Sequence, residues 1–403
     1  MEYGFLLSII IPTKNRCNFI IKAVEQILQM NEYRIQVIIQ DNSDTQELSE
    51  MLSAYKDDVR LKYNYTEDII SFVDNFSLAV MLAEGEYVCI IGDDDGVVPQ
   101  IIDVTEWASN NNIDAVRPEL NAVYFWPNSK AVGRKTDNGY MSINKITAKS
   151  RLCNPIAEVV KLLNQGGQKY LSLDMVKLYH GIVKRECLEK IKRQTGAYFG
   201  GLSPDIYIAV ALSLTANKVV AIDFPLTISG ICNKSGSADS ATGKHTGRLE
   251  DAPHLRGHDK YKWSDLVPKF YSVETIWADS ALAAIKDLNE LEMYKEFNVT
   301  GLTAYCLKKY PQFKDIIMLH YNICSKTAGN SKSELIFANI KDTTADCIKK
   351  GIRKIKRGRG HLVQIYGIEN IIKAEDVLKQ RFKDIGINTE MVITSLNEVL
   401  KKL

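Results

Sequence analysis

The chain has 403 residues, more than a single domain usually holds, so two domains are the default expectation. Its composition is ordinary for a globular protein, and the net charge of +2 at pH 7 favours neither a nucleic-acid partner nor an acidic one. The eight cysteines form no CxxC pair, and the first apolar run, Phe5 to Ile11, is too short to span a bilayer. These features predict a cytoplasmic protein with reduced thiols that does not bind nucleic acid.

Strands and helices are predicted to alternate over the first hundred residues. Apolar runs predict strands at 6–11, 35–39, 61–65 and 87–91. Apolar residues at three- and four-residue spacing predict helices at 17–30, 46–55 and 71–82. Fully apolar strands separated by helices predict an α/β fold with a mostly parallel sheet that helices cover on both faces.

The later part of the chain has a different pattern. Short strands are predicted at 115–116, 123–125 and 219–222, and residues 233–259 lack an apolar pattern, which predicts a long loop. Helical periodicity covers 272–289 and 302–309, and lysine-rich helices are predicted from there to the end. We therefore expect two domains, 1–265 and 266–403, of which the second is mainly helical and serves a membrane surface or oligomerisation.

Polar segments follow three of the predicted strands. They are Pro12-Thr-Lys-Asn-Arg16, Asp41-Asn-Ser-Asp44 and the triplet Asp93-Asp94-Asp95. The carboxyl ends of parallel strands share one edge of a sheet, where ligands bind in such folds. Three adjacent carboxylates repel one another unless a cation lies among them, and hard oxygen ligands suit Mg²⁺ or Mn²⁺. The alternative for the triplet is a solvated Asp-Gly turn, because Gly96 follows it.

These segments resemble a known family. The order and spacing of Ser8-Ile-Ile-Ile-Pro-Thr-Lys-Asn-Arg16, Asp41-Asn-Ser-Asp44 and Ala83-Glu-Gly-Glu-Tyr87, followed by the aspartate triplet and Pro99, are similar to the nucleotide-sugar domain of family 2 inverting glycosyltransferases. The resemblance covers roughly residues 6 to 230. It implies the GT-A fold, with a Rossmann-like sheet, and an enzyme of bacterial surface-polysaccharide synthesis.

The resemblance also implies roles for residues of the nucleotide site. Three residues after the first strand would line the uridine pocket of a UDP-sugar donor: Pro12, Thr13 and Arg16. Asp41 would bond the uracil edge, and Asp93 would face the ribose. Many relatives have Ala-Arg-Asn where this chain has Val73-Asp74-Asn75, so a basic contact to the donor is lost or comes from elsewhere.

The metal and the catalytic base follow from the same resemblance. Asp94 and Asp95 would hold the divalent cation, Mn²⁺ or Mg²⁺, although the triplet here starts after Gly92 and leaves the choice of ligand open by one position. The base of the family commonly follows a glutamate, and here Asp205 follows Pro204. Asp205 would deprotonate a hydroxyl of a saccharide or lipid-linked acceptor. The structural alternative for Asp205 is a helix N-cap.

Other features leave alternatives open. His180 is either a buried structural histidine or a residue of the acceptor side, and His245, His254 or His258 would complete the metal shell or bond the diphosphate, or neither. Residues 233–237 are a lid or a plain surface loop. Basic residues crowd 348–359 with isoleucines at helical spacing, which predicts contact with the inner face of a membrane or a solvated helix face.

Two other functions fit parts of the sequence. Asp93-Asp94-Asp95-Gly96-Val97 matches the nucleophile motif of haloacid-dehalogenase-like phosphatases, with Asp93 as nucleophile, but that motif usually opens its domain. A non-catalytic subunit that binds a nucleotide sugar is the remaining alternative.

Overall fold

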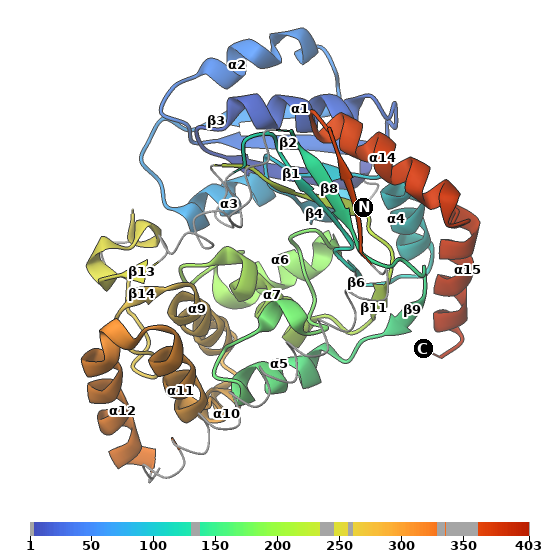
Figure 1. Cartoon of the computed structure of the whole chain (residues 1–403). Helices are drawn as coiled ribbons and strands as arrows, with labels where there is room; N and C mark the ends of the chain where they lie inside the picture. Colours follow the sequence, from blue (N-terminus) through green and yellow to red (C-terminus); the bar gives the residue numbers. More distant parts are fainter. Residues whose placement is uncertain are drawn as a thin grey trace.

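The computed structural model describes residues 4–129, 138–233, 246–256, 261–328, 335 and 362–402. Its largest feature is an eight-stranded sheet in the order β3-β2-β1-β4-β10-β6-β11-β9 (Figure 1). The strands are β1 (Phe5–Thr13), β2 (Ile35–Asp41), β3 (Leu61–Tyr65), β4 (Gly85–Ile90), β6 (Ala115–Pro118), β9 (Ser150–Leu152), β10 (Ile182–Lys184) and β11 (Val219–Ile222). The four N-terminal strands pair in parallel, whereas β10 runs antiparallel between β4 and β6.

Helices cover both faces of this sheet, as predicted. Side chains of β1 alternate between two cores, because Ile9 and Ile11 pack on one face and Ile10 on the other. The first core is covered by α1 (Cys17–Leu28), α4 (Gln100–Asn110), α14 (Ile371–Asp384) and α15 (Thr389–Leu400). The second is covered by α3 (Phe72–Met81), α5 (Pro155–Asn164), α6 (Arg185–Thr195), α7 (Pro204–Thr215), α9 (Val273–Asp287) and α11 (Val299–Lys309). The predicted α/β fold is confirmed.

A second sheet joins distant parts of the chain. Its order is β15-β8-β7-β12-β5, and its strands are β5 (Gly96–Val97), β7 (Ala122–Phe125), β8 (Tyr140–Ile143), β12 (Thr227–Ile231) and β15 (Val363–Tyr366). A small hairpin pairs β13 (Thr246–Gly247) with β14 (Tyr271–Ser272). The remaining α-helices of the described residues are α2 (Glu47–Met51), α10 (Leu291–Lys295) and α12 (Lys314–Ala328).

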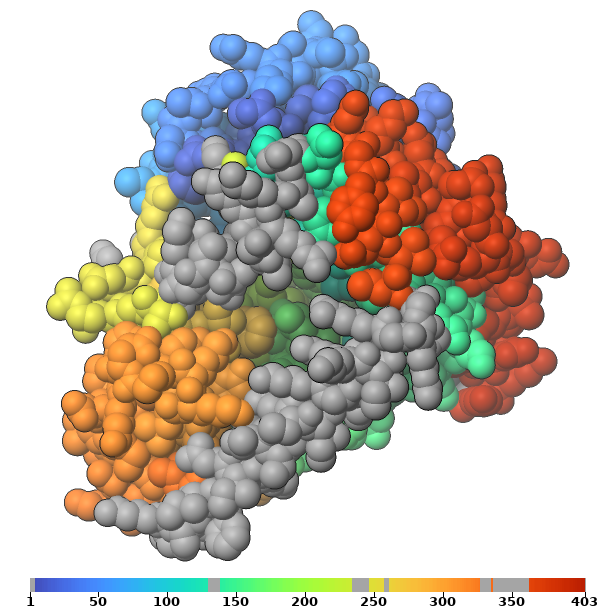
Figure 2. Space-filling view, viewed as in Figure 1, coloured from blue at the N-terminus to red at the C-terminus, as the bar shows by residue number. Residues whose placement is uncertain are grey.

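The end of the chain packs on its beginning. Figure 2 shows residues 362–402, in red, lying against the N-terminal half, away from the orange residues that precede them. Trp107 Nε1 donates to Asn397 Oδ1 at 2.9 Å, and Gln26 Nε2 donates to Glu375 Oε2 at 2.5 Å. The described residues of 266–403 are mainly helical as predicted, apart from β14 and β15. The division at residue 265 stays a prediction, and the basic segment 348–359 lies outside the described residues.

Candidate functional site

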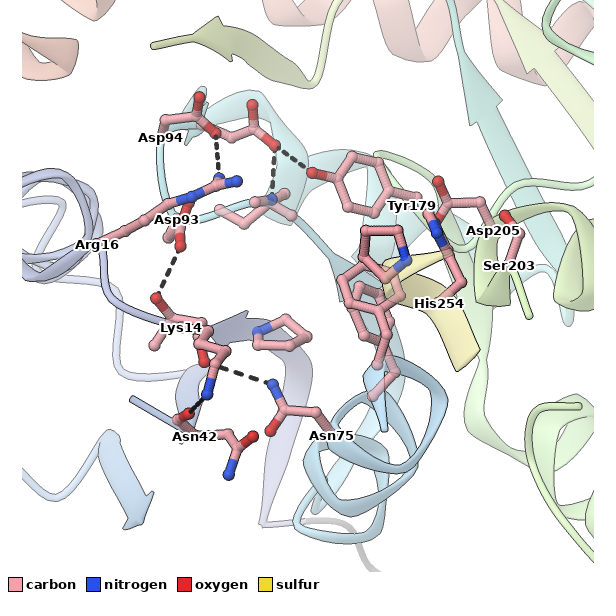
Figure 3. A pocket seen from close by; sticks show the side chains of 18 of the residues that line it. Lys14, Arg16, Asn42, Asn75, Asp93, Asp94, Tyr179, Ser203, Asp205 and His254 are labelled. Carbon is pink, nitrogen blue, oxygen red and sulfur yellow. Dashed lines mark hydrogen bonds and ion pairs between the residues drawn. The ribbon is translucent and has the colours of Figure 1, made fainter. Parts of the chain in front are cut away.

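A cavity of about 840 Å³ lies beyond the carboxyl ends of β1 and β4 (Figure 3). Its lining includes every predicted site residue except Asp41: Pro12, Thr13, Arg16, Asp93, Asp94, Asp95 and Asp205. The parallel pairing of β1 with β2 and β4 brings the polar segments to one edge, as the strand pattern predicts. Asp205 comes from α7, more than a hundred residues after the triplet, and lies across the cavity from Asp93 and Asp94 (Figure 3).

The first aspartate of the triplet is held by the end of β1. The Thr13 hydroxyl donates to one oxygen of Asp93 at 2.7 Å, and the Arg16 guanidinium donates to the other at 2.8 Å. Burial opposes the charge on Arg16, but the charges of Asp93 and Asp94 outweigh it and raise the pKa of the guanidinium above its ordinary value. Arg16 is therefore a fixed positive charge beside the triplet.

The second aspartate of the triplet accepts the fewest hydrogen bonds to offset its negative charge. Asp94 is 4% exposed, and its Oδ2 accepts one hydrogen bond from the N–H of Cys232 at 3.0 Å. Its Oδ1 lies 3.9 Å from Arg16 and accepts no hydrogen bond from any residue that the structure describes. Burial, and then the charges of Asp95 and Asp93, raise the pKa of Asp94 to about 8. An added cation would relieve this carboxylate most.

The third aspartate is surrounded by protein donors. Asp95 accepts from the N–H groups of Gly92 and Gly230, both at 2.6 Å, and from the hydroxyl of Tyr179 at 3.1 Å. Burial raises its pKa to about 6, and these donors oppose that rise. Its carboxylate joins β4, β12 and the segment before β10, so its position is fixed without a metal.

Asp205 stands apart from other charged groups. It lies in the first turn of α7, and Ser203 is the N-cap residue, so the alternative of Asp205 as the cap is wrong. The carboxylate accepts no side-chain or backbone hydrogen bond within the described ranges. Burial raises its pKa to about 6, which leaves it ionised but basic at neutral pH.

Asp41 lies outside the cavity lining. It is fully buried, and its carboxylate accepts from the N–H of Ser43 at 2.8 Å and from the Tyr63 hydroxyl at 2.9 Å. Its role at the uracil edge stays a prediction. The next residue, Asn42, does line the cavity, and so does Asn75 of α3. The Oδ1 atom of Asn75 is buried and has no hydrogen-bond partner among the described residues, so it can accept from a ligand.

The histidines divide into two groups. His180 is buried, its Nδ1 lies 2.9 Å from the Thr227 hydroxyl, and burial lowers its pKa to about 3, so it is neutral. It is also a cavity residue, with its Nε2 3.5 Å from Asp95. His254 lines the side of the cavity that holds Asp205 (Figure 3). His245, His258 and residues 234–237 lie outside the described residues.

Sequence reasoning missed several cavity residues. Tyr179 lies between the triplet and Asp205, and Ser203 lies beside Asp205 (Figure 3). Aromatic side chains also line the cavity: Phe72, Tyr271 and Trp277. These residues come from separate helices and strands and follow no motif, so a single sequence gives no signal that joins them.

The first part of the chain matches a described family. The profile "Glycosyl transferase family 2" matches residues 8–130, which include both strand-end segments and the triplet. This stretch is a family 2 glycosyltransferase domain. The domain supplies one side of the cavity, whereas Asp205, Ser203 and Trp277 lie beyond it.

Curated relatives of the family 2 domain are glycosyltransferases. The putative colanic acid biosynthesis glycosyl transferase WcaA of Escherichia coli is 32% identical over 26% of this chain and 38% of its own length. Glycosyltransferase GlyG of Streptococcus pneumoniae is 26% identical over 24% of this chain and 33% of its own. An uncharacterized glycosyltransferase of Rickettsia felis is 30% identical over 22% of this chain and 15% of its own. The matches thus span less than two fifths of these relatives.

A solved structure similar in part is that of Staphylococcus aureus TarS residues 1–349 in complex with UDP-GlcNAc. It is 15% identical, covers 81% of this chain and 93% of that one, and has a TM-score of 0.44. Similarity at that level assigns no ligand to this chain. In the part of the chain that the structure describes, no helix combines the length and apolarity needed to cross a bilayer.

Proposed function

We propose that the protein is an inverting glycosyltransferase that moves a sugar from a UDP-sugar to a hydroxyl of a saccharide or lipid-linked acceptor. The observation that carries this proposal is the placement of Asp94 and Asp205 on opposite sides of one cavity (Figure 3). The family 2 match of residues 8–130 supports transfer of a glycosyl group. The name of the E. coli relative supports a role in surface-polysaccharide synthesis.

The donor nucleotide would lie against the end of β1 and the start of α3. Pro12, Thr13 and Arg16 offer apolar, hydroxyl and cationic contacts there, with Asp93 held beside the ribose by the last two. The unpartnered Oδ1 of Asn75 would accept a hydrogen bond from an N–H of the base. Uracil carries such an N–H at N3, so uridine is compatible with this acceptor, as are other nucleosides that carry an N–H donor.

The residues fit a divalent cation, Mn²⁺ or Mg²⁺, at Asp94. Its Oδ1 has no hydrogen bond from the described residues, and its pKa near 8 reflects a charge that lacks compensation. Asp95, the other predicted ligand, already accepts three hydrogen bonds from protein donors and would contribute less. When bound, such an ion stabilises the charge that develops on a diphosphate leaving group. Among the described residues, no group of three or more His, Cys, Asp or Glu forms a complete metal site, so substrate or water would supply the other ligands.

Asp205 would act as the general base. The acceptor oxygen forms a bond to the anomeric carbon of the sugar while the bond from that carbon to the diphosphate breaks, and Asp205 takes the acceptor's proton. A pKa near 6 leaves Asp205 deprotonated at pH 7 and still a useful base. Because the base and the diphosphate side face each other across the cavity, attack comes from the face opposite the leaving group. An α-linked donor would therefore give a β-linked product.

The other functions have less support. In a phosphatase, Asp93 would need a free oxygen to attack phosphorus, but both of its oxygens accept hydrogen bonds, from Thr13 and Arg16. A subunit that only binds a nucleotide sugar has no use for Asp205, a half-buried carboxylate without hydrogen-bond partners among the described residues, because its ionised form lowers stability.

The test is the release of UDP from a panel of UDP-hexoses and UDP-N-acetylhexosamines, with and without Mn²⁺. We expect one or a few donors to be hydrolysed slowly without acceptor and faster with a mixture of methyl hexopyranosides. Activity should be lost in Asp94→Asn and Asp205→Asn. A protein that releases UDP from no donor, or that forms an aspartyl-phosphate from phosphate esters, would overturn the proposal.

A further inference from the structure

The cavity has two chemically different sides. Charged and amide side chains from β1, β4 and α3 line the side of the triplet. Four rings also line the cavity, and we call them the aromatic wall: Phe72 at the start of α3, His254, Tyr271 and Trp277; His254 lies on the side of Asp205 (Figure 3). Asp205 lies on the second side, across the cavity from the triplet and next to Ser203 and His254 (Figure 3). The residues that we propose to bind the donor lie on the first side, so the second side is available to the acceptor.

Three rings of the aromatic wall lie near one another, and the fourth, Trp277, packs on Tyr170. The ring of His254 lies 6.2 Å from Phe72 and 5.7 Å from Tyr271, measured between centroids. The ring of Trp277 meets Tyr170 edge to face at 4.7 Å. Tyr170 in turn lies close enough to Asp205 for that carboxylate, after burial, to raise the pKa of its phenol. The wall is therefore a pre-ordered surface near the proposed base.

Ser203 supplies a second, independent observation. It is the N-cap residue of α7, yet its side chain makes no capping hydrogen bond, although serine at this position usually does. The residue is 7% exposed and lines the cavity, and its hydroxyl has no hydrogen-bond partner among the described residues. Because Ser203 lines the cavity, this hydroxyl can form a hydrogen bond with a ligand there.

We propose that a pyranose ring of the acceptor stacks on the aromatic wall, with neighbouring hydroxyls bound by Ser203 and Asp205. A sugar ring has an apolar face of C–H groups and a rim of hydroxyls, which matches aromatic faces beside a hydroxyl and a carboxylate. An alkyl chain would satisfy the aromatic wall but would leave Ser203 and Asp205 without partners. The acceptor unit in this subsite is therefore a saccharide, whether or not a lipid is attached further along. This inference rests on the proposed function.

The first test measures binding without catalysis. Saturation-transfer NMR with methyl glycosides of glucose, galactose, mannose, N-acetylglucosamine and N-acetylgalactosamine should show transfer to ring C–H protons of at least one glycoside in the wild-type protein. The signal should be lost in Trp277→Ala and reduced in Ser203→Ala. Tyr33→Ala is the matched control, because Tyr33 is 68% exposed and is not a lining residue of the cavity. Binding of none of the glycosides, or binding of dodecyl phosphate instead, would overturn the proposal.

The second test separates this inference from the proposed function. Ser203→Ala removes a hydroxyl that has no partner in the described residues, so folding should be unaffected. We expect Ser203→Ala and Trp277→Ala to raise the KM for the acceptor glycoside about tenfold or more, and to raise the KM for the donor by much less. If the wild type hydrolyses no donor, the proposed function fails. If the wild type transfers sugar and both variants keep its acceptor KM, only the acceptor subsite is wrong.

Discussion

The backbone N–H of Gly230 donates to Asp95 Oδ1 at 2.6 Å, and this contact joins the end of β12 to the triplet after β4. The approach is so close that a Cβ on Gly230 would lie 1.7 Å from the carbonyl oxygen of Asp94. Two residues on, the N–H of Cys232 donates to Asp94 itself. The end of β12 thus determines where two of the three carboxylates lie.

Gly230→Ala should therefore disrupt the site. The contact is with backbone, which cannot move aside as a side chain can, so we expect a loss of about 3 kcal/mol or more in the free energy of unfolding. Urea denaturation measures this free energy of unfolding. Gly247→Ala is the matched control, because a Cβ there meets nothing within 4 Å. Equal stability of the two variants would show that β12 does not hold the triplet in this way.

Asp94 and Asp95 should respond differently to the same change. Gly92 and Gly230 donate to different oxygens of Asp95, so in Asp95→Asn an NH₂ group opposes one of these two N–H groups, and we expect a loss of about 1–3 kcal/mol in the free energy of unfolding. Asp94→Asn replaces a carboxyl group whose ionisation burial and the neighbouring aspartates oppose, so it should leave the metal-free protein as stable as the wild type, or more so. Thermal unfolding without metal measures both. If Asp94→Asn lost more stability than Asp95→Asn, this would contradict the account in which Asp95 has a structural role and Asp94 binds the metal.

Asp205 should set the acid limb of the pH–rate profile. Because only the carboxylate form accepts a proton, kcat/KM for transfer should fall about tenfold per pH unit below its pKa, near 6. Asp205→Asn should lower kcat by about 10²–10⁴-fold. A flat profile between pH 5 and 8 in the wild type would exclude Asp205 as the base.

Stability provides the control for this variant. Burial raises the pKa of Asp205 above its value in the unfolded chain, so the folded state holds the proton more tightly. The ionised carboxylate therefore destabilises the fold, and this effect grows as pH rises from about 4 through 6. Asp205→Asn avoids it, so at pH 8 the variant should be at least as stable as the wild type. Lower stability would mean that its loss of activity reflects misfolding.

The C-terminal residues should support the segment that carries the aspartate triplet. Gln26 of α1 donates to Glu375 of α14 and to the carbonyl of Val97, two residues after the triplet. Glu375 is 5% exposed, and Glu375→Ala leaves Gln26 with one acceptor fewer, which should cost about 1–3 kcal/mol in the free energy of unfolding. Glu398→Ala, at an exposed position of α15, should change it by less than about 0.5 kcal/mol. Equal effects would mean that α14 does not support the triplet through Gln26.

Local sequence patterns predicted the strands and helices whose formation depends mainly on residues near one another in the chain. β1, β2 and β4 are mostly apolar because both faces of the sheet are covered, and parallel pairing brings their polar ends together. Asp205 follows proline at the start of an apolar helix and lines the cavity, and its role as the base, which the family resemblance implies, stays a prediction. The antiparallel strand β10 has three residues and gives no pattern of its own. Its pairing between β4 and β6 depends on contacts far apart in the chain.

Long-range contacts also explain what the site analysis missed. β15 pairs with β8, although more than two hundred residues separate them, and the lysine-rich composition near the end of the chain predicted only helices. Whether Asp41 is available to a ligand depends on Tyr63 of the neighbouring strand β3, whose hydroxyl donates a hydrogen bond to one oxygen of the Asp41 carboxylate. Asp95 looks like Asp94 in sequence, and only the donors Gly92, Gly230 and Tyr179 distinguish the two. Burial and hydrogen-bond partners of this kind cannot be read from one sequence.

The central claim is that Asp94 binds the metal ion and Asp205 acts as the general base. The most direct measurement is calorimetric titration of UDP, with and without Mn²⁺, into the wild type, Asp94→Asn and Asp205→Asn. We predict Mn²⁺-dependent binding in the wild type, equal binding in Asp205→Asn, and loss of the Mn²⁺ dependence in Asp94→Asn. Binding that is the same in all three proteins, or that is lost in Asp205→Asn alone, would contradict the account.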